Sequence, residues 1–305
     1  MAPPTEPVAE PAVAPPAAGP ITETRALVPV PRVDDEREPL PDPRRGDVDE
    51  WGRSAHARRV AGRLFDPVYR RWFRAEWDGL DRIPAEGGAL LVANHAGAVP
   101  VDAPVIMHGI EREVGRPVYG LADYMFRTLP YVGVGWARLG GVPAHRDNAY
   151  RLLREQQQLA LVFPEGTKGT GKLYRDRYRL RRFGRGGFVE IAMRAGVPIV
   201  PIAVVGAEEA MPILARAPAG IAQKLGLPYL PLTANMLALG PLGLFGYFPA
   251  KFRLRVLEPA TFDDVEPDQD RYSRHRIMEE SERIRERIQE ALLDMLRARS
   301  SVWFG

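Results

Sequence analysis

A histidine and an aspartate stand close together after an apolar run in the segment LLVANHAGAVPVDAP, residues 90–104. Asn94 and His95 follow the run directly, and Asp102 comes seven positions after His95, past Gly97 and Pro100, which favour a tight turn. A neutral imidazole is the usual base for a hydroxyl group, because its unperturbed pKa is about 6.5. A carboxylate on the other ring nitrogen fixes the tautomer and stabilises the imidazolium. The pair therefore predicts general-base chemistry, with Asp102 the nearest candidate for the partner of His95.

The two side chains most often used as nucleophiles are missing from the body of the chain. The 305 residues include no cysteine, and no serine occurs between Ser54 and Ser273. A nucleophile-elbow hydrolase and a thiol protease are therefore excluded, since each needs one of these side chains in its site. Any acyl chemistry must use a nucleophile of the substrate, activated by a base.

Arg146 follows two glycines, a proline and a histidine in GGVPAHRDN, residues 140–148. A guanidinium in such a turn can bind a phosphate through two parallel hydrogen bonds. The alternative is a solvated arginine ahead of a helix that Asp147 or Asn148 caps. Taken alone, the segment favours this alternative.

A third segment, LVFPEGTKGTGK at residues 161–172, joins an apolar strand to Glu165 and a glycine-rich loop. Such a loop can present a carboxylate and backbone N–H groups to a ligand. Gly166 to Lys172 also fits the phosphate-binding pattern G-x-x-x-x-G-K. Leu173 stands where that pattern needs a magnesium-binding serine or threonine. A nucleotide hydrolase is therefore only a remote alternative.

The elements that must position these residues alternate along the chain. Apolar, β-rich runs predict five strands, and the segments between them have the length of helices. This alternation predicts an α/β fold with a mixed, largely parallel sheet flanked by helices. Ligands in such sheets lie off the carboxyl ends of the strands, where both His95 and Glu165 stand. The predicted strands are 87–95, 116–123, 159–163, 196–206 and 251–259, and the predicted helices between them are 101–113, 123–130, 147–158 and 186–195.

The two ends of the chain differ in composition. Residues 1–50 hold twelve prolines and no aromatic residue, which predicts a disordered Pro/Ala-rich arm that is not a secretory signal. Residues 51–305 are predicted to form a single domain, with a motif-bearing core at 75–260. A helix is predicted at 268–297, because apolar residues recur on one side of it, namely Ile277, Ile284, Ile288, Leu292 and Met295.

Two segments suggest contact with a membrane. A helix at 51–65, with Val60, Ala61, Leu64 and Phe65 on its apolar side, is expected to restart at Asp66 and Pro67. Arginines flank its aromatic residues, so it is either a packed surface helix or an interfacial helix on anionic lipid. Residues 225–250 hold no charge, but their prolines argue against a single spanning helix. We expect a hairpin that dips into the interface or a wall around an acyl channel, with a buried loop as the alternative.

Four segments in this order resemble the four blocks of the glycerolipid acyltransferase family, which includes the 1-acylglycerol-3-phosphate and lysophospholipid acyltransferases. They are NHAGAVPVD, GGVPAHRDN, FPEGTKG and GVPIVPIAV, within residues 75–260. The resemblance implies that His95 is the general base and Asp102 its partner. It implies that Arg146 binds the phosphate of the acceptor. The acceptor site would be shaped by Glu165, Gly166 and Thr167, and Pro201 would be a structural proline.

The chain departs from the family pattern in two places. Six residues separate His95 from Asp102, where the family usually has four, and this places the chain nearest a branch with the longer spacing. Lys168 stands where the family often has arginine. Because lysine binds phosphate as a point charge and not as a fork, Lys168 bears on which acceptor is bound.

The resemblance implies a membrane-associated enzyme at the cytoplasmic face. It would move a fatty acyl group from acyl-CoA or acyl-carrier protein to a glycerolipid hydroxyl, with 1-acylglycerol-3-phosphate as the expected acceptor. We expect no cofactor and no metal site. We also expect no nucleic-acid partner, since few aromatic residues interleave the arginine clusters. The alternative from another class is a catalytically inactive membrane-binding protein of the same fold, which the altered spacing suggests.

Overall fold

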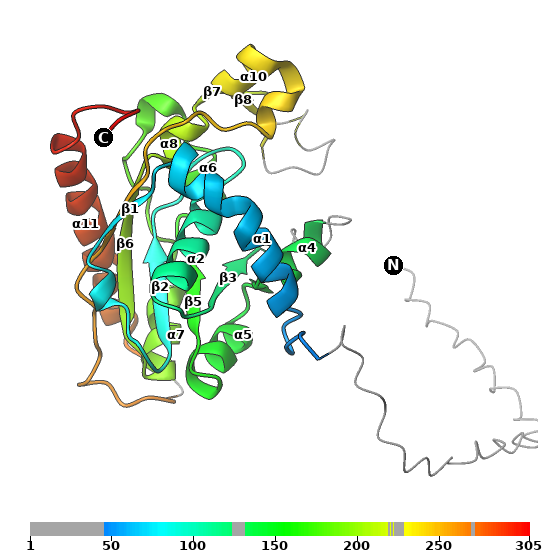
Figure 1. Ribbon diagram of the computed structural model, residues 1–305. Coiled ribbons are helices and arrows are strands. Elements are labelled where there is room, and N and C mark those ends of the chain that lie inside the picture. The colour runs from blue at the N-terminus through cyan, green and yellow to red at the C-terminus, as the bar shows by residue number, and fades with distance from the viewer. Residues whose placement is uncertain (1–45, 124–131, 219, 221, 223–228, 270–271) are drawn as a thin grey trace, which may run out of the picture. The chain divides into compact units, whose positions relative to one another are not determined.

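The structure, a computed structural model, describes residues 46–123, 132–218, 220, 222, 229–269 and 272–305. Most of the expected N-terminal arm and nearly all of the helix expected at 123–130 lie outside these residues. The described part contains a seven-stranded sheet with helices on both faces (Figure 1). The predicted fold class, a mixed and largely parallel sheet flanked by helices, is confirmed.

The sheet contains all five predicted strands. In spatial order it consists of β1 (Glu76–Asp78), β9 (Arg253–Val256), β6 (Ile199–Val205), β2 (Ala89–Ala93), β5 (Leu159–Val162), β3 (Val118–Ala122) and β4 (Gly141–Pro143). β6 and β9 are antiparallel, and every other neighbouring pair is parallel. β1 and β4 have three residues each, which is too short to leave a periodic pattern in the sequence.

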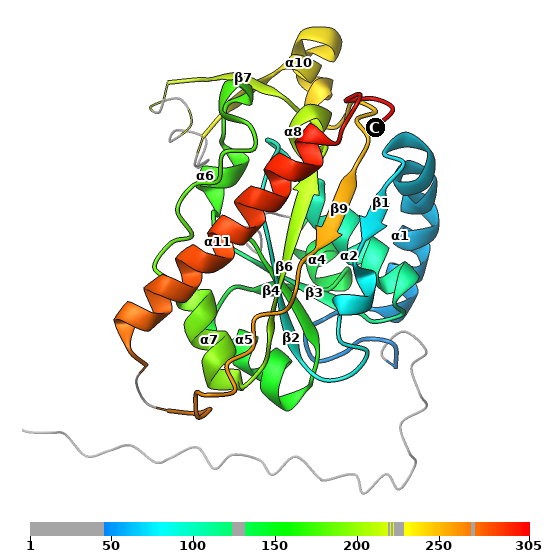
Figure 2. The ribbon, with the colours of Figure 1, turned by 90° about the vertical axis from the view of Figure 1, so that its left-hand side faces the viewer.

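The helices form a layer on each face of the sheet. Residues of β2 alternate between the two layers, with Leu91 and Ala93 in one apolar core and Leu90 and Val92 in the other. The first core includes residues of α2 (Asp102–Glu113), next to which lies α1 (Ala55–Pro67). The second includes residues of α7 (Gly187–Ala195) and α11 (Arg274–Arg297), with α5 (Arg146–Tyr150) beside them (Figure 2).

The C-terminal helix begins later than predicted. Ser273 is its N-cap, and the Ser273 hydroxyl accepts a hydrogen bond from the backbone N–H of Arg276. A serine cap ends the preceding loop at this point. The predicted apolar side of this helix is buried against the sheet, as its sequence pattern indicates.

The restart predicted at Asp66 and Pro67 is wrong. α1 continues through Pro67 into a π-helical turn, Val68–Trp72, because the missing N–H of proline widens the helix and does not end it here. The Asp66 carboxylate lies against Arg112 and His108 of α2 and does not cap a helix. On the apolar side expected to pack, Phe65 contacts the core and His108, whereas Val60 and Leu64 are exposed, Leu64 to 74%.

The uncharged stretch at 225–250 forms short elements from Tyr229 onward. Its residues build β8 (Pro231–Thr233), α10 (Ala234–Leu239) and a 3₁₀ turn, Gly240–Leu244. β8 pairs with β7 (Ile213–Arg216) in a separate two-stranded sheet. Among the described residues, no helix combines the length and the apolar character needed to cross a membrane.

Candidate active site

His95 and Asp102 form a hydrogen-bonded pair at the carboxyl end of β2. The Nδ1 atom of His95 lies 2.9 Å from Oδ2 of Asp102, which begins α2 and is fully buried. The same carboxylate accepts hydrogen bonds from the backbone N–H groups of Ala96 (2.9 Å) and Ala103 (2.8 Å). The aspartate is therefore held rigidly, and Nε2 of the imidazole, whose side chain is 13% exposed, makes no hydrogen bond with the described residues.

Three neighbours set the position of the His95 ring. The Asn94 side chain exchanges hydrogen bonds with the backbone of Val204, at 2.9 and 2.8 Å, and so prolongs the pairing of β2 with β6. The Phe163 ring stacks on the imidazole, with a centroid distance of 4.0 Å. Gly97 has a φ of +85°, which turns the chain back toward α2. The six-residue spacing is accommodated in this loop.

Glu165 fixes the backbone of the loop that begins at His95. Its buried carboxylate accepts hydrogen bonds from the backbone N–H groups of His95 (3.2 Å) and Arg181 (2.7 Å). It also lies 3.3 Å from the Nζ atom of Lys172. With these partners, the Glu165 carboxylate faces the protein and not the solvent. A Cβ atom added at Gly169 would lie 2.9 Å from the carbonyl oxygen of His95, so only glycine lets this loop approach so closely.

Lys172 is a buried ammonium between two carboxylates, and the sequence analysis did not identify this role. Its Nζ atom lies 3.3 Å from Glu165 and 3.3 Å from Glu208, a residue of α8 (Ala207–Ala210). The phosphate-binding-loop interpretation is therefore wrong, because its lysine is occupied by protein carboxylates and the Gly166 N–H donates to the Phe163 carbonyl. Lysine is rare in the chain, four against 38 arginines, but this rarity does not predict a buried ion pair at Lys172.

Glu208 should make the stability of the protein depend on pH. Burial raises the pKa of the Glu208 carboxyl from 4.5 to about 7, against the opposing effect of Lys172. Between these two values the folded state binds more protons than the unfolded state, so its stability falls as pH rises. We expect Glu208→Gln to remove this decline. Urea titrations of both proteins between pH 4.5 and pH 7 measure the free energy of unfolding. If it falls equally with pH in both proteins, the prediction is wrong.

Four other predicted site residues, Gly166, Thr167, Lys168 and Arg146, form no hydrogen bond or ion pair with His95 or Asp102 among the described residues. Gly166, Thr167 and Lys168 are exposed at the start of α6 (Thr167–Thr170). Arg146 is also exposed, and its guanidinium lies 3.1 Å from Glu190 of α7. β5 and β3 stand between β2 and β4, so three strand spacings of about 4.8 Å separate the strand that leads to Arg146 from that of the histidine.

The N-cap of α5 is neither Asp147 nor Asn148, the two residues expected from the sequence. His145 is the N-cap, and its Nδ1 atom accepts from the backbone N–H of Asp147 at 3.3 Å. Asn148 donates instead to the carbonyl of Pro143, 3.0 Å away. Histidine has a weak preference for this position, which is why the sequence pattern pointed to the two residues that follow.

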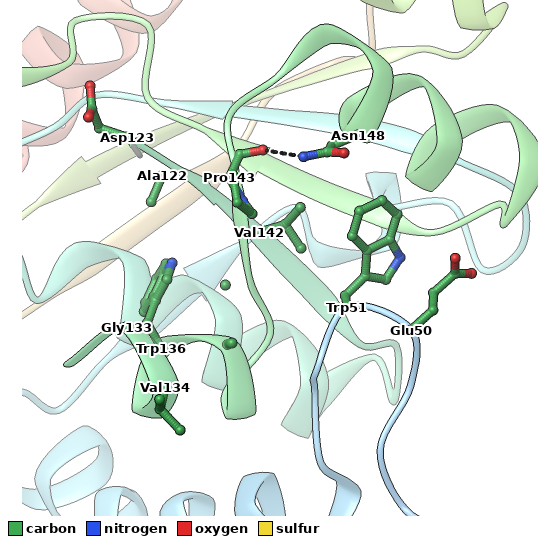
Figure 3. Close-up of a pocket in the computed structure, with 12 residues that line it drawn as sticks. Glu50, Trp51, Ala122, Asp123, Gly133, Val134, Trp136, Val142, Pro143 and Asn148 are labelled. Atoms are coloured by element: carbon green, nitrogen blue, oxygen red, sulfur yellow. Dashed lines mark hydrogen bonds between the residues drawn. The ribbon is translucent and has the colours of Figure 1, made fainter. Parts of the chain in front are cut away.

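A cavity of about 500 Å³ opens near the carboxyl ends of β3 and β4 (Figure 3). Trp51 and Trp136 stand on two sides of it, with Val134 from α4 (Val132–Arg138) at its edge. Neither His95 nor Asp102 lines this cavity. The His95–Asp102 pair therefore lies outside this hollow.

Comparison with known proteins gives the family. The chain is 39% identical over 262 residues to an uncharacterized protein of Mycobacterium tuberculosis, covering 85% of this chain and 72% of that relative. Residues 74–205 match the family described as Acyltransferase. The chain belongs to the acyltransferase family. This segment contains all the predicted site residues, and the enzyme class predicted from the four sequence segments is confirmed.

Two further similarities concern proteins whose names state an activity. The chain is 26% identical over 209 residues to the human "DGAT1/2-independent enzyme synthesizing storage lipids", covering 68% of this chain and 60% of that enzyme. Its fold is similar to the crystal structure of the 1-acyl-sn-glycerophosphate acyltransferase PlsC of Thermotoga maritima, with a TM-score of 0.50 and 21% identity. That match covers 81% of this chain and 83% of the other.

Proposed function

We propose that this acyltransferase moves a fatty acyl group from acyl-CoA or acyl-carrier protein to a hydroxyl of a membrane glycerolipid, with His95 as the general base. The observation that carries the proposal is the 2.9 Å contact between the His95 ring and the fully buried Asp102. A buried, doubly hydrogen-bonded carboxylate on Nδ1 is the arrangement that directs Nε2 of an imidazole toward a substrate proton.

The reaction needs no nucleophile from the protein. The acceptor hydroxyl gives its proton to Nε2 of His95 while its oxygen attacks the thioester carbonyl. The carbon–sulfur bond then breaks, and the departing thiolate takes the proton back from the imidazolium. Asp102 stabilises the positive ring between these steps. The product is an ester and a free thiol, with His95 returned to its starting state.

The negative oxygen of the tetrahedral intermediate needs hydrogen-bond donors. The Gly166 N–H is used within the protein. We assign this role to the Gly97 N–H, which makes no hydrogen bond with any residue that the structure describes and stands two residues beyond His95. A donor so placed stabilises charge that develops only in the transition state.

For the acceptor we propose 1-acylglycerol-3-phosphate, bound through Arg146 and Lys168. Both cations are exposed on the carboxyl side of the sheet. A neutral glycerolipid is the second candidate, because Glu190 already engages Arg146 and the human relative is named for storage lipids. Glu165 is proposed as a positioning residue, since its carboxylate holds the backbone of His95.

The two acceptors can be separated by removing the cations. We expect Lys168→Ala and Arg146→Ala each to raise KM for the phosphate-bearing acceptor by about tenfold or more, because each loses a charge-assisted hydrogen bond. The KM for a monoacylglycerol should not change. Steady-state assays with both acceptors measure this. Equal effects on both acceptors would exclude phosphate recognition by these residues.

The proposal as a whole is tested by mass spectrometry of products. Purified protein is incubated with a mixed pool of lysophospholipids and mono- and diacylglycerols, and with either acyl-CoA or acyl-carrier protein. A new ester from one acceptor class identifies the acceptor and the donor together. Binding to lipid vesicles without any product, under every combination, would instead support the inactive membrane-binding alternative.

A further inference from the structure

We propose that an exposed apolar projection beside the catalytic loop docks on the surface of a lipid bilayer. We call it the apolar cap and define it as Leu232, Leu237, Leu239, Leu242 and Phe245, on β8, α10 and the turn that follows. The most exposed of these, Leu237 and Phe245, are each 81% exposed. Side chains of this size are rarely left together in water unless they bind something.

The apolar cap projects beyond the end of the sheet at which the catalytic loop lies. Figures 1 and 2 both show α10 and β7 at the tip of this end, past α6 and α8. A projecting surface fits a flat, deformable partner such as a bilayer.

Hydrogen bonds join the apolar cap to the loop between His95 and Asp102. The Tyr247 hydroxyl, two residues after Phe245, donates to the carbonyl of Val99 at 3.1 Å. On the other side of the cap, the Tyr229 hydroxyl donates to the carbonyl of Ala98 at 3.5 Å. An apolar cap inserted among lipid headgroups would therefore hold the catalytic loop at the depth of a glycerolipid hydroxyl.

Aromatic side chains extend the same surface. The Trp72 indole N–H donates to the carbonyl of Tyr247 at 3.0 Å, and the Trp303 ring packs edge-on against Phe248. Trp72, Trp303 and Phe304 are all exposed. Tryptophan at the rim of an apolar surface is typical of the membrane interface, where its ring is partly apolar and its N–H can be hydrated.

The charge around the apolar cap favours an anionic lipid surface over a second protein. No acidic residue occurs between Glu209 and Glu258, the stretch that contains the cap. Arg71, beside Trp72, and Arg216 of β7 are exposed and form no ion pair with any other residue in the described ranges. Apolar insertion and nearby basic residues together are the combination that binds proteins to anionic bilayers.

The docking proposal rests on the proposed function for its choice of a lipid partner, so its test separates the two. Full-length protein and a Leu237→Ser/Phe245→Ser variant are mixed with vesicles of phosphatidylcholine, alone or with phosphatidylglycerol as the minority lipid. Flotation measures the bound fraction. We expect the variant to bind at least about tenfold more weakly, because two large apolar side chains no longer insert.

A matched control and a second assay keep the result interpretable. Val134→Ser removes a side chain that is 67% exposed on α4, outside the cap, and should bind vesicles like the unchanged protein. Acyl transfer is measured with vesicle-embedded acceptor and with a short-chain acceptor in solution. The Leu237→Ser/Phe245→Ser variant should lose rate on vesicles only, which shows that its catalytic loop is intact.

Each outcome decides one of the two proposals. Equal binding by the variant and the unchanged protein overturns the docking proposal, whatever the activity. A dimer in solution that the substitutions dissociate, with no vesicle binding, overturns it as well, because the apolar cap is then a protein interface. Strong, cap-dependent vesicle binding without acyl transfer supports docking and contradicts the proposed function.

Discussion

Replacing His95 with alanine is expected to lower the rate of acyl transfer by about 10²–10⁴-fold, the usual contribution of a positioned general base. The loss should appear in kcat and not in KM, because the imidazole takes up a proton only during the reaction. The measurement is transfer of a labelled acyl group from purified donor, with folding checked by circular dichroism. A variant that keeps its full rate would remove His95 from the mechanism.

The chain contains a suitable control for this substitution. His108 also lies near an aspartate, with its Nε2 atom 3.3 Å from Asp66, and burial lowers its pKa. It packs edge-on against Phe65 and Tyr69, between α1 and α2. His108→Ala should cost stability but not the rate per folded molecule. If both variants lose activity equally, the effect of His95→Ala comes from unfolding and not from chemistry.

Replacing Lys172 with methionine is expected to destabilise the protein by about 3–5 kcal/mol, the usual cost of removing one partner from a buried ion pair. Methionine has a similar length, but it leaves Glu165 and Glu208 buried without the cation that separates them. Urea unfolding measures the loss. A change of less than about 1 kcal/mol, the range of an exposed ion pair, would show that the pairing is not important.

The same substitution tests whether Lys172 acts through Glu165 on the catalytic loop. At temperatures where Lys172→Met stays folded, we expect a lower kcat with little change in KM, since the backbone of His95 would lose its fixed carboxylate. Adding Glu208→Gln should restore part of the stability, because only one buried carboxylate then remains to be neutralised. Restored stability with a persistently low kcat is the result that separates positioning from folding.

Much of the fold could be predicted from the sequence because its signals are local. The strands on either side of β2 are apolar over several residues, and the stripe on α11 repeats every three to four residues. Such patterns depend only on which face of an element is buried. The short strands β1 and β4, and the exposure of Val60 and Leu64 on α1, depend on neighbours far away in the chain, so no local pattern predicts them.

The site divides in the same way. The pairing of His95 with Asp102 could be predicted, because the two residues are close in sequence and a turn brings them together. The role of Lys172 could not, because one of its partners, Glu208, is 36 positions away and a charged residue in a glycine-rich loop looks solvated. The separation of Arg146 from His95 could not be predicted either, because it depends on the order of the strands in the sheet.

The sequence by itself determined the chemistry to expect: no serine or cysteine nucleophile in the body of the domain, a histidine with a nearby acid, and strands that end just before His95 and Glu165. The tertiary structure decided which charges are buried and which apolar side chains are exposed, as Lys172 and Phe245 illustrate. The physical reason is that burial depends on contacts between segments that are distant in the chain. Residue type and local spacing fix what a side chain can do, and packing fixes whether it meets the protein, a substrate or a membrane.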